Sequence, residues 1–203
     1  MVPSGSKPVR HDITLLTDLD LYLFNEGTHY RVYEKLGAHP LKVDGGEGTY
    51  FAVWAPNARQ VSVVGDFNGW ARESHPLRPR GHSGVWEGFV PGVGQGALYK
   101  YHIVSWYNGY QVDKADPVAF CTEVPPKTAS VVWDLEYSWA DGEWMAQRHR
   151  RNALDAPLAI YEVHLGSWMR VPEEGHRPLT YQEMAPRLAE YIRRMGFTHV
   201  EFL

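Results

Sequence analysis

The sequence predicts a mainly β protein, an immunoglobulin-like antiparallel β-sandwich followed by the first βαβ unit of an incomplete (β/α)₈ barrel. Between about residues 48 and 137, short β-rich runs alternate with turn residues, a spacing that favours a sandwich. After residue 158 the pattern changes to strand, helix, strand, and a crossover of that length joins parallel strands.

Residues 1–35 are interpreted as a tail with short helices. The polar, irregular residues 1–16 predict a disordered tail. Thr17–Gly27 predicts a helix, because Thr17 suits the N-cap and Gly27 suits the C-terminal end. A second short helical piece is expected over Tyr30–Lys35.

Residues 36–137 are assigned to the sandwich. Asn108-Gly109 is a strong two-residue hairpin signal. Strands are expected at Thr49–Trp54, Gln60–Val64, Val85–Val90, Leu98–Trp106, Tyr110–Asp113 and Ser130–Asp134.

Residues 138–157 are interpreted as a linker, and its basic run Arg148–Arg151 as a solvated face. Residues 158–203 predict a strand at Leu158–Leu165, a loop over 166–179, a helix ending at Met195 and a further strand. Thr180 and Glu183 fit a capping box, but the interior Pro186 moves the expected regular start to near Met184. These 46 residues are far fewer than the roughly 250 of a complete barrel, so we expect a truncated chain.

Composition narrows the classes of function. The net charge of −4 disfavours binding to nucleic acid or anionic membranes, and no apolar run is long enough to span a bilayer. The single cysteine and the absence of a signal-like start predict a cytoplasmic protein. No metal-ligand spacing or nucleotide loop occurs, so we expect neither a metal nor a cofactor. Eight Trp, twelve Tyr and seven Phe make 13% of the chain aromatic, which hints at sugar rings as ligands.

An ordered set of motifs then resembles one family. The stretches are Leu23–His29, Leu36–Pro40, Phe51–Ala58, Val64–Trp70, Gly84–Glu87, Tyr99–Tyr101, Lys114–Pro117, Pro125–Ser130, Ile160–Trp168 and Gly196–Glu201. Over about residues 14–203 the chain resembles the N-terminal part of glycogen (1,4-α-glucan) branching enzymes of the α-amylase superfamily, including their family 48 carbohydrate-binding module.

This resemblance implies a retaining transglycosidase that cuts α-1,4 links and forms α-1,6 branches with a nucleophilic carboxylate and an acid. No position of the chain matches those carboxylates, so no catalytic residue is assigned and the chain alone is expected to be inactive. The implied partners are an α-glucan and the missing remainder of the catalytic barrel.

Aromatic and polar residues of the sandwich are the candidate carbohydrate ligands. Trp70, with Asn68, lies on a predicted turn where an indole can stack on glucose or pack against a neighbouring domain. Lys100, Trp106 and Tyr110 lie on or beside the Asn108-Gly109 hairpin, where ordinary cross-strand packing is the favoured interpretation and sugar binding the alternative.

The barrel segment has weaker candidates. Glu162 and His164 share one face of the first strand, and a hydrogen-bonded pair at the rim is the favoured interpretation. Ser167 and Trp168 are placed in the first βα loop. Two alternatives to a branching enzyme remain open: a debranching or trehalose-releasing hydrolase with the same module, and a non-catalytic glycogen-binding protein.

Overall fold

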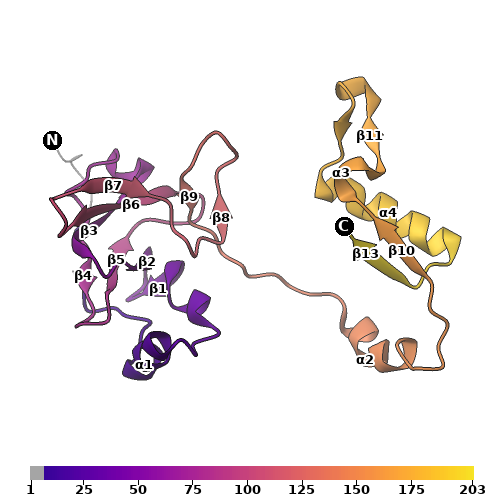
Figure 1. Cartoon of the computed structure of the whole chain (residues 1–203), viewed down its shortest axis with the longest axis horizontal. Helices are drawn as coiled ribbons and strands as arrows, with labels where there is room; N and C mark the ends of the chain where they lie inside the picture. The colour runs from indigo at the N-terminus through magenta and orange to yellow at the C-terminus, as the bar shows by residue number, and fades with distance from the viewer. Residues whose placement is uncertain (1–6) are drawn as a thin grey trace. The chain divides into compact units, whose positions relative to one another are not determined.

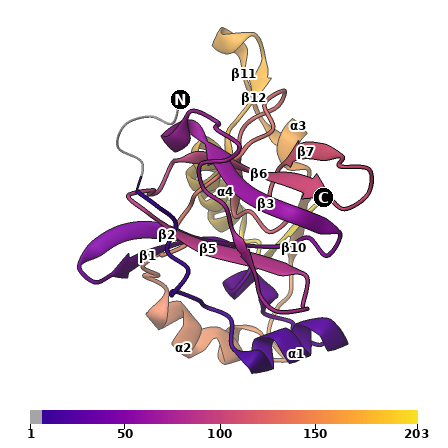
Figure 2. The ribbon, with the colours of Figure 1, turned by 90° about the vertical axis from the view of Figure 1, so that its left-hand side faces the viewer.

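Two antiparallel sheets face each other in the first part of the chain, as Figures 1 and 2 show. The computed structural model describes residues 7–203 and divides after Tyr137 into two compact units. The first sheet has the order β1 (Gly37–Val43), β2 (Gly46–Trp54), β5 (Val85–Pro91) and β4 (Arg78–Pro79). The second has the order β3 (Ala58–Gly65), β6 (Leu98–Ser105), β9 (Ser130–Val131) and β8 (Cys121–Thr122), with β7 (Gln111–Lys114) also beside β6. The predicted sandwich is confirmed.

The main core lies between these sheets. Phe51 of β2 packs against Tyr99 of β6, with ring centroids 5.1 Å apart. The hydroxyls of Tyr99 and Tyr101 donate to Oδ2 of the buried Asp116 at 2.7 and 3.1 Å. These bonds satisfy hydroxyls that would otherwise be costly to bury. Other buried residues of this core include Val53, Val61, Val63, Leu77, Val90 and Val132.

A second cluster covers the other face of the first sheet, so β2 is buried on both sides. It contains Leu16 of the N-terminal segment together with Tyr50 and Phe89. Helix α1 (Asp18–Glu26) lies over this face in both ribbon views. The disorder predicted for the first residues is therefore wrong over 7–16, since Leu16 is 3% exposed and the backbone of Arg10 exchanges hydrogen bonds with Phe89. Residues 1–6 lie outside the described part.

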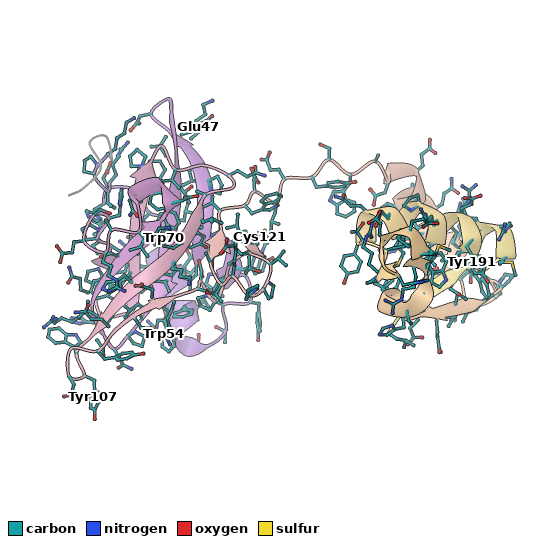
Figure 3. All side chains as sticks on the ribbon, turned by 90° about the horizontal axis from the view of Figure 1, so that it is seen from above. Glu47, Trp54, Trp70, Tyr107, Cys121 and Tyr191 are labelled. Atoms are coloured by element: carbon teal, nitrogen blue, oxygen red, sulfur yellow. The ribbon has the colours of Figure 1, made fainter. Side chains whose placement is uncertain are left out.

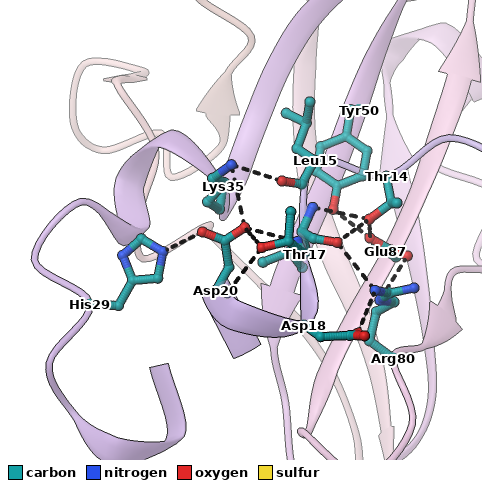
Figure 4. Close-up of polar contacts among 11 residues, drawn as sticks. Thr14, Leu15, Thr17, Asp18, Asp20, His29, Lys35, Tyr50, Arg80 and Glu87 are labelled. Carbon is teal, nitrogen blue, oxygen red and sulfur yellow. Dashed lines mark hydrogen bonds and ion pairs between the residues drawn. The ribbon is translucent and has the colours of Figure 1, made fainter. Parts of the chain in front are cut away.

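Buried polar contacts fasten this N-terminal segment to the sheet (Figure 4). Oε2 of the fully buried Glu87 accepts hydrogen bonds from Tyr50 at 2.6 Å and from Thr14 at 2.7 Å. Arg80 donates to the carbonyl of Leu16 at 3.2 Å. Thr17 caps α1 as predicted, through the backbone N–H of Asp20.

Strand β1, which contains Pro40, was not predicted. The strand lies at the edge of its sheet, where a missing N–H costs no ladder bond. The helix expected over Tyr30–Lys35 is one 3₁₀ turn, η1 (Val32–Glu34). The two-residue strands β4 and β8 were also missed. Strand β9 ends at Val131 instead of Asp134.

The second unit contains the predicted βαβ arrangement. Strands β10 (Ile160–Val163) and β13 (His199–Phe202) are parallel neighbours, joined through helix α4 (Tyr181–Met195). The capping box of Thr180 and Glu183 is present, but the helix begins at Tyr181 and not near Met184. Pro186 removes the hydrogen bond that the carbonyl of Gln182 would accept. Both residues are exposed, so water can hydrate that carbonyl and the helix continues.

Short elements occupy segments predicted to be irregular. Helix α2 (Gly142–Arg151) lies within the expected linker 138–157. The expected loop 166–179 contains α3 (Leu165–Trp168), the strand pair β11 (Arg170–Val171) and β12 (Arg177–Pro178), and the 3₁₀ turn η3 (Pro172–Glu174). In the part of the chain that the structure describes, no helix is both long and apolar enough to cross a membrane.

Candidate carbohydrate-binding face

The turn after β3 presents Trp70, whose side chain is 42% exposed. A 3₁₀ turn, η2 (Asp66–Asn68), leads to Gly69 and Trp70, which both have left-handed backbones with φ of 61° and 60°. That conformation is uncommon for a residue with a side chain. The backbone N–H of Trp70 donates to the carbonyl of Gly65 at 2.8 Å, which closes the turn.

Asn68 organises this turn from inside. Its side chain is fully buried. Its Oδ1 accepts the N–H of Gly65 at 2.9 Å, and its Nδ2 donates to the carbonyl of Val63 at 3.0 Å. The predicted contact between Asn68 and a sugar is therefore corrected, because the buried amide is already used within the protein.

The outer face of β6 carries a chain of polar contacts. Lys100 donates from Nζ to Oγ1 of Thr128 at 2.7 Å. Two residues along, Nδ1 of His102 lies 2.6 Å from Oδ1 of Asp113 on β7. Arg72, from the turn that carries Trp70, donates to the other oxygen of Asp113 at 2.9 Å. The turn and the sheet are thus joined through one carboxylate.

Hydrogen bonding also governs the charge of that carboxylate. Partial burial raises the pKa of Asp113, but the bonds from His102 and Arg72 outweigh it and lower the pKa below its ordinary value. Asp113 is therefore ionised at neutral pH and holds Arg72 in place.

The β6–β7 hairpin presents three exposed rings. Trp106 is 72% exposed and Tyr110 is 60% exposed. Asn108 and Gly109 both have positive φ, and the N–H of Tyr110 donates to the carbonyl of Tyr107 at 3.1 Å, so a turn is present at the predicted dipeptide. The strand pairing closes earlier, where the N–H of Ser105 donates to the carbonyl of Tyr110 at 2.8 Å, so the hairpin loop is residues 106–109 and not the two residues predicted. Figure 3 shows Tyr107 projecting from the end of the hairpin.

Not all of the predicted carbohydrate-binding residues contact one another in the structure. Within residues 7–203, no ring contact links Trp70 to Trp106 or Tyr110. The sequence interpretation missed Thr128 as a partner of Lys100, although Thr128 lies in the Pro125–Ser130 motif. Nothing in the sequence pointed to Arg72, since its partner is 41 residues away.

In the second unit, the expected hydrogen-bonded pair of Glu162 and His164 is not formed. Strand β10 ends at Val163, and Nδ1 of His164 lies 2.9 Å from Oγ of Ser167. The indole N–H of Trp168 donates to the hydroxyl of Tyr161 at 3.1 Å. The βα loop after β10 is thereby held by its own side chains.

Comparison with known proteins agrees with this arrangement. Residues 35–119 match the family described as Carbohydrate-binding module 48 (Isoamylase N-terminal domain). The chain is 58% identical over 190 residues to the 1,4-alpha-glucan branching enzymes GlgB of Paramagnetospirillum magneticum and Rubrobacter xylanophilus. It is 53% identical over 191 residues to that of Aquifex aeolicus. These matches cover 93–94% of the chain.

The chain is related to the N-terminal region of 1,4-alpha-glucan branching enzymes. It spans 26–30% of the length of these three relatives. The predicted relationship to a branching enzyme with a family 48 module is confirmed at this level.

Two solved structures share the fold of this chain. A pullulanase mutant of Klebsiella pneumoniae, PulA-G680L, superposes with a TM-score of 0.58 at 23% identity over 83% of this chain and 17% of the other. The catalytic module of the pneumococcal protein SpuA gives 0.55 at 19% identity, over 83% of this chain and 26% of the other. At these identities the likeness concerns the fold alone.

The chemistry of the face suits binding more than reaction. Exposed rings can stack on sugars. A lysine amine and carboxylate oxygens can form hydrogen bonds with sugar hydroxyls. Among the described residues, no cluster of three or more His, Cys, Asp or Glu is placed to hold a metal ion.

Proposed function

We propose that the sandwich binds α-glucan on the face that contains Trp70, Lys100 and the β6–β7 hairpin. The match to a carbohydrate-binding module carries this proposal. The 42% exposure of Trp70, and the left-handed backbone on which it is held, support it. Asn68 serves by shaping the turn, and Trp106 and Tyr110 offer further stacking surfaces.

We further propose that the chain works as the N-terminal part of a 1,4-α-glucan branching enzyme, which cleaves α-1,4 links and forms α-1,6 branches. Identity of 58% over 93% of the chain supports this function. Retaining chemistry needs two carboxylates roughly 5 Å apart, and we assign no residue of this chain to that pair. The remainder of a (β/α)₈ barrel would supply it. The single cysteine supports a place in the cytoplasm.

Binding of the 203-residue chain to soluble glycogen, by affinity electrophoresis, tests the first proposal. We expect Trp70→Ala to weaken binding at least tenfold. Trp144→Ala is the matched control, because Trp144 is similarly exposed at 47% but lies in the second unit. If the unaltered chain does not bind glycogen, the proposal fails and the sandwich is a purely structural module.

The second proposal is tested on amylose. We expect the 203-residue chain alone to leave the iodine complex of amylose unchanged. A fall in its absorbance together with new α-1,6 links would show that the chain itself carries catalytic residues, contrary to our assignment.

A further inference from the structure

We propose that the sandwich has a second α-glucan site, in a groove of about 480 Å³ formed by the N-terminal segment, η1, β1 and the segment after β9. This inference rests on the proposed α-glucan binding. The volume falls within the range of clefts that bind small ligands. The lining of the groove includes Tyr33, His39, Phe120, Trp133 and Glu136, and none of the candidate residues of the Trp70 face.

Aromatic rings supply the stacking surfaces of this groove. Tyr33 is 45% exposed and Trp133 is 41% exposed, so each keeps part of its ring accessible. Phe120 is less exposed and packs edge-on against His39, with ring centroids 5.7 Å apart. Rings held in this way lose little conformational freedom when a flat apolar surface such as a pyranose face binds.

Hydrogen-bond acceptors surround these rings. Glu34, Asp134 and Glu136 line the groove. Oδ1 of Asp134 accepts the backbone N–H of Glu136 at 2.9 Å, which fixes the carboxylate and leaves its second oxygen available. Carboxylates accept the hydroxyl hydrogens of a sugar, whereas they repel a phosphorylated or otherwise anionic ligand. A neutral, hydroxyl-rich oligosaccharide therefore fits this lining.

His39 makes the floor of the groove neutral. Its Nε2 lies 2.9 Å from the carbonyl of Leu36, so this nitrogen carries the hydrogen that is donated. Burial lowers the pKa of His39, which keeps the ring uncharged at neutral pH. His39 therefore brings no positive charge that would neutralise the carboxylates and favour an anion.

Two sites on one rigid module would favour long glucans. When one site holds a glucan chain, a second segment of that chain is at high effective concentration near the other site. The inference thus adds a preference for polymer over short oligosaccharides, which a single Trp70 site would not produce.

Isothermal titration of the 203-residue chain with maltoheptaose tests the groove. We expect two molecules bound per chain, and one each for Trp133→Ala and for Trp70→Ala. Tyr33→Ala provides a second probe of the groove if Trp133→Ala fails to fold, as judged by thermal unfolding. Trp144→Ala should retain both sites. Added salt should leave the affinity unchanged, because the ligand is neutral.

The outcomes separate this inference from the proposed function. Unchanged stoichiometry and affinity in Trp133→Ala and Tyr33→Ala overturn the groove while leaving the Trp70 face intact. If Trp133→Ala loses one site while Trp70→Ala keeps both, the result supports the groove and counts against the Trp70 face. No binding of maltoheptaose or glycogen by the unaltered chain overturns both.

Discussion

Nδ2 of Asn68 lies 2.9 Å from Nδ1 of His75, and both side chains are buried beneath the turn that carries Trp70. The orientation of the amide is determined by the backbone, since Gly65 donates to its oxygen and Val63 accepts from its nitrogen. Nδ1 of His75 must therefore accept, which requires the neutral ring with its hydrogen on Nε2. The shape of the turn thus depends on the protonation state of a histidine.

Replacing Asn68 by Ala should destabilise the sandwich by roughly 2–4 kcal/mol, because buried backbone groups of Gly65 and Val63 lose their partners. Glycogen binding should weaken as well, since the turn no longer holds Trp70. Urea unfolding and affinity electrophoresis measure the two effects. Asn25→Ala, at an exposed position of α1, is the control and should change neither.

Stability should fall as the pH is lowered from 7.5 to 5.5. Burial lowers the pKa values of His75 and His39 below the ordinary value of about 6.5. A lowered folded-state pKa gives stability that is present above the unfolded-state value and is lost as the pH falls through the folded-state value. Urea midpoints across this range measure the effect. His75→Gln should flatten the dependence, whereas the exposed His82→Gln should not; an equal slope in all three proteins would refute the argument.

Asp116→Ala should cost about 2–5 kcal/mol, because the buried hydroxyls of Tyr99 and Tyr101 lose their common acceptor. Thermal unfolding provides the measurement. Glu73→Ala serves for comparison, since Glu73 is an exposed acidic residue of the same unit. Equal melting temperatures for these two variants would show that other groups satisfy the tyrosines.

The capping carboxylate of α4 should titrate at unusually low pH. The Arg177 guanidinium and the hydrogen bonds from Thr180 lower the pKa of Glu183 to about 2. Its contribution to helix stability is therefore present above the ordinary glutamate pKa and is lost only as the pH falls toward 2. Side-chain carboxyl shifts in an NMR titration of the chain and of Arg177→Gln check this. An ordinary glutamate midpoint in the unaltered chain would contradict it.

Amide hydrogens should exchange faster in residues 158–203 than in the sandwich. The core of the second unit has four buried apolar residues, Val163, Leu179, Met184 and Leu188, and each of its two sheets has only two strands. Small cores and unpaired strand edges lower the free energy of local opening. Deuterium uptake followed by mass spectrometry measures the exchange rates of the two units. Equal protection of β10 and β6 would show that the second unit is independently stable.

Local patterns predicted most of the elements. The capping residues Thr17 and Thr180, and the hairpin turn at Asn108-Gly109, were correctly identified because each depends on neighbours within a few residues. Pro186 was misjudged because the cost of a proline inside a helix depends on whether the carbonyl that loses its partner can reach water, which the neighbours in sequence do not reveal. Strand β1, which contains Pro40, was missed; it lies at the edge of its sheet, where a proline is tolerated.

The sequence by itself determined the class of fold, the relationship to branching enzymes and the position of the hairpin turn, since these depend on local pattern and on ordered motifs. Only the tertiary structure decided which candidates are available to a ligand. Asn68 is fully buried because backbone groups of β3 and the turn enclose its amide. Arg72 meets Asp113, and Tyr33 lines a groove with Trp133, because the fold brings together segments that are 41 and 100 residues apart. Packing between segments far apart in the sequence decides which side chains are buried and which pair with one another. A local sequence pattern does not contain that information.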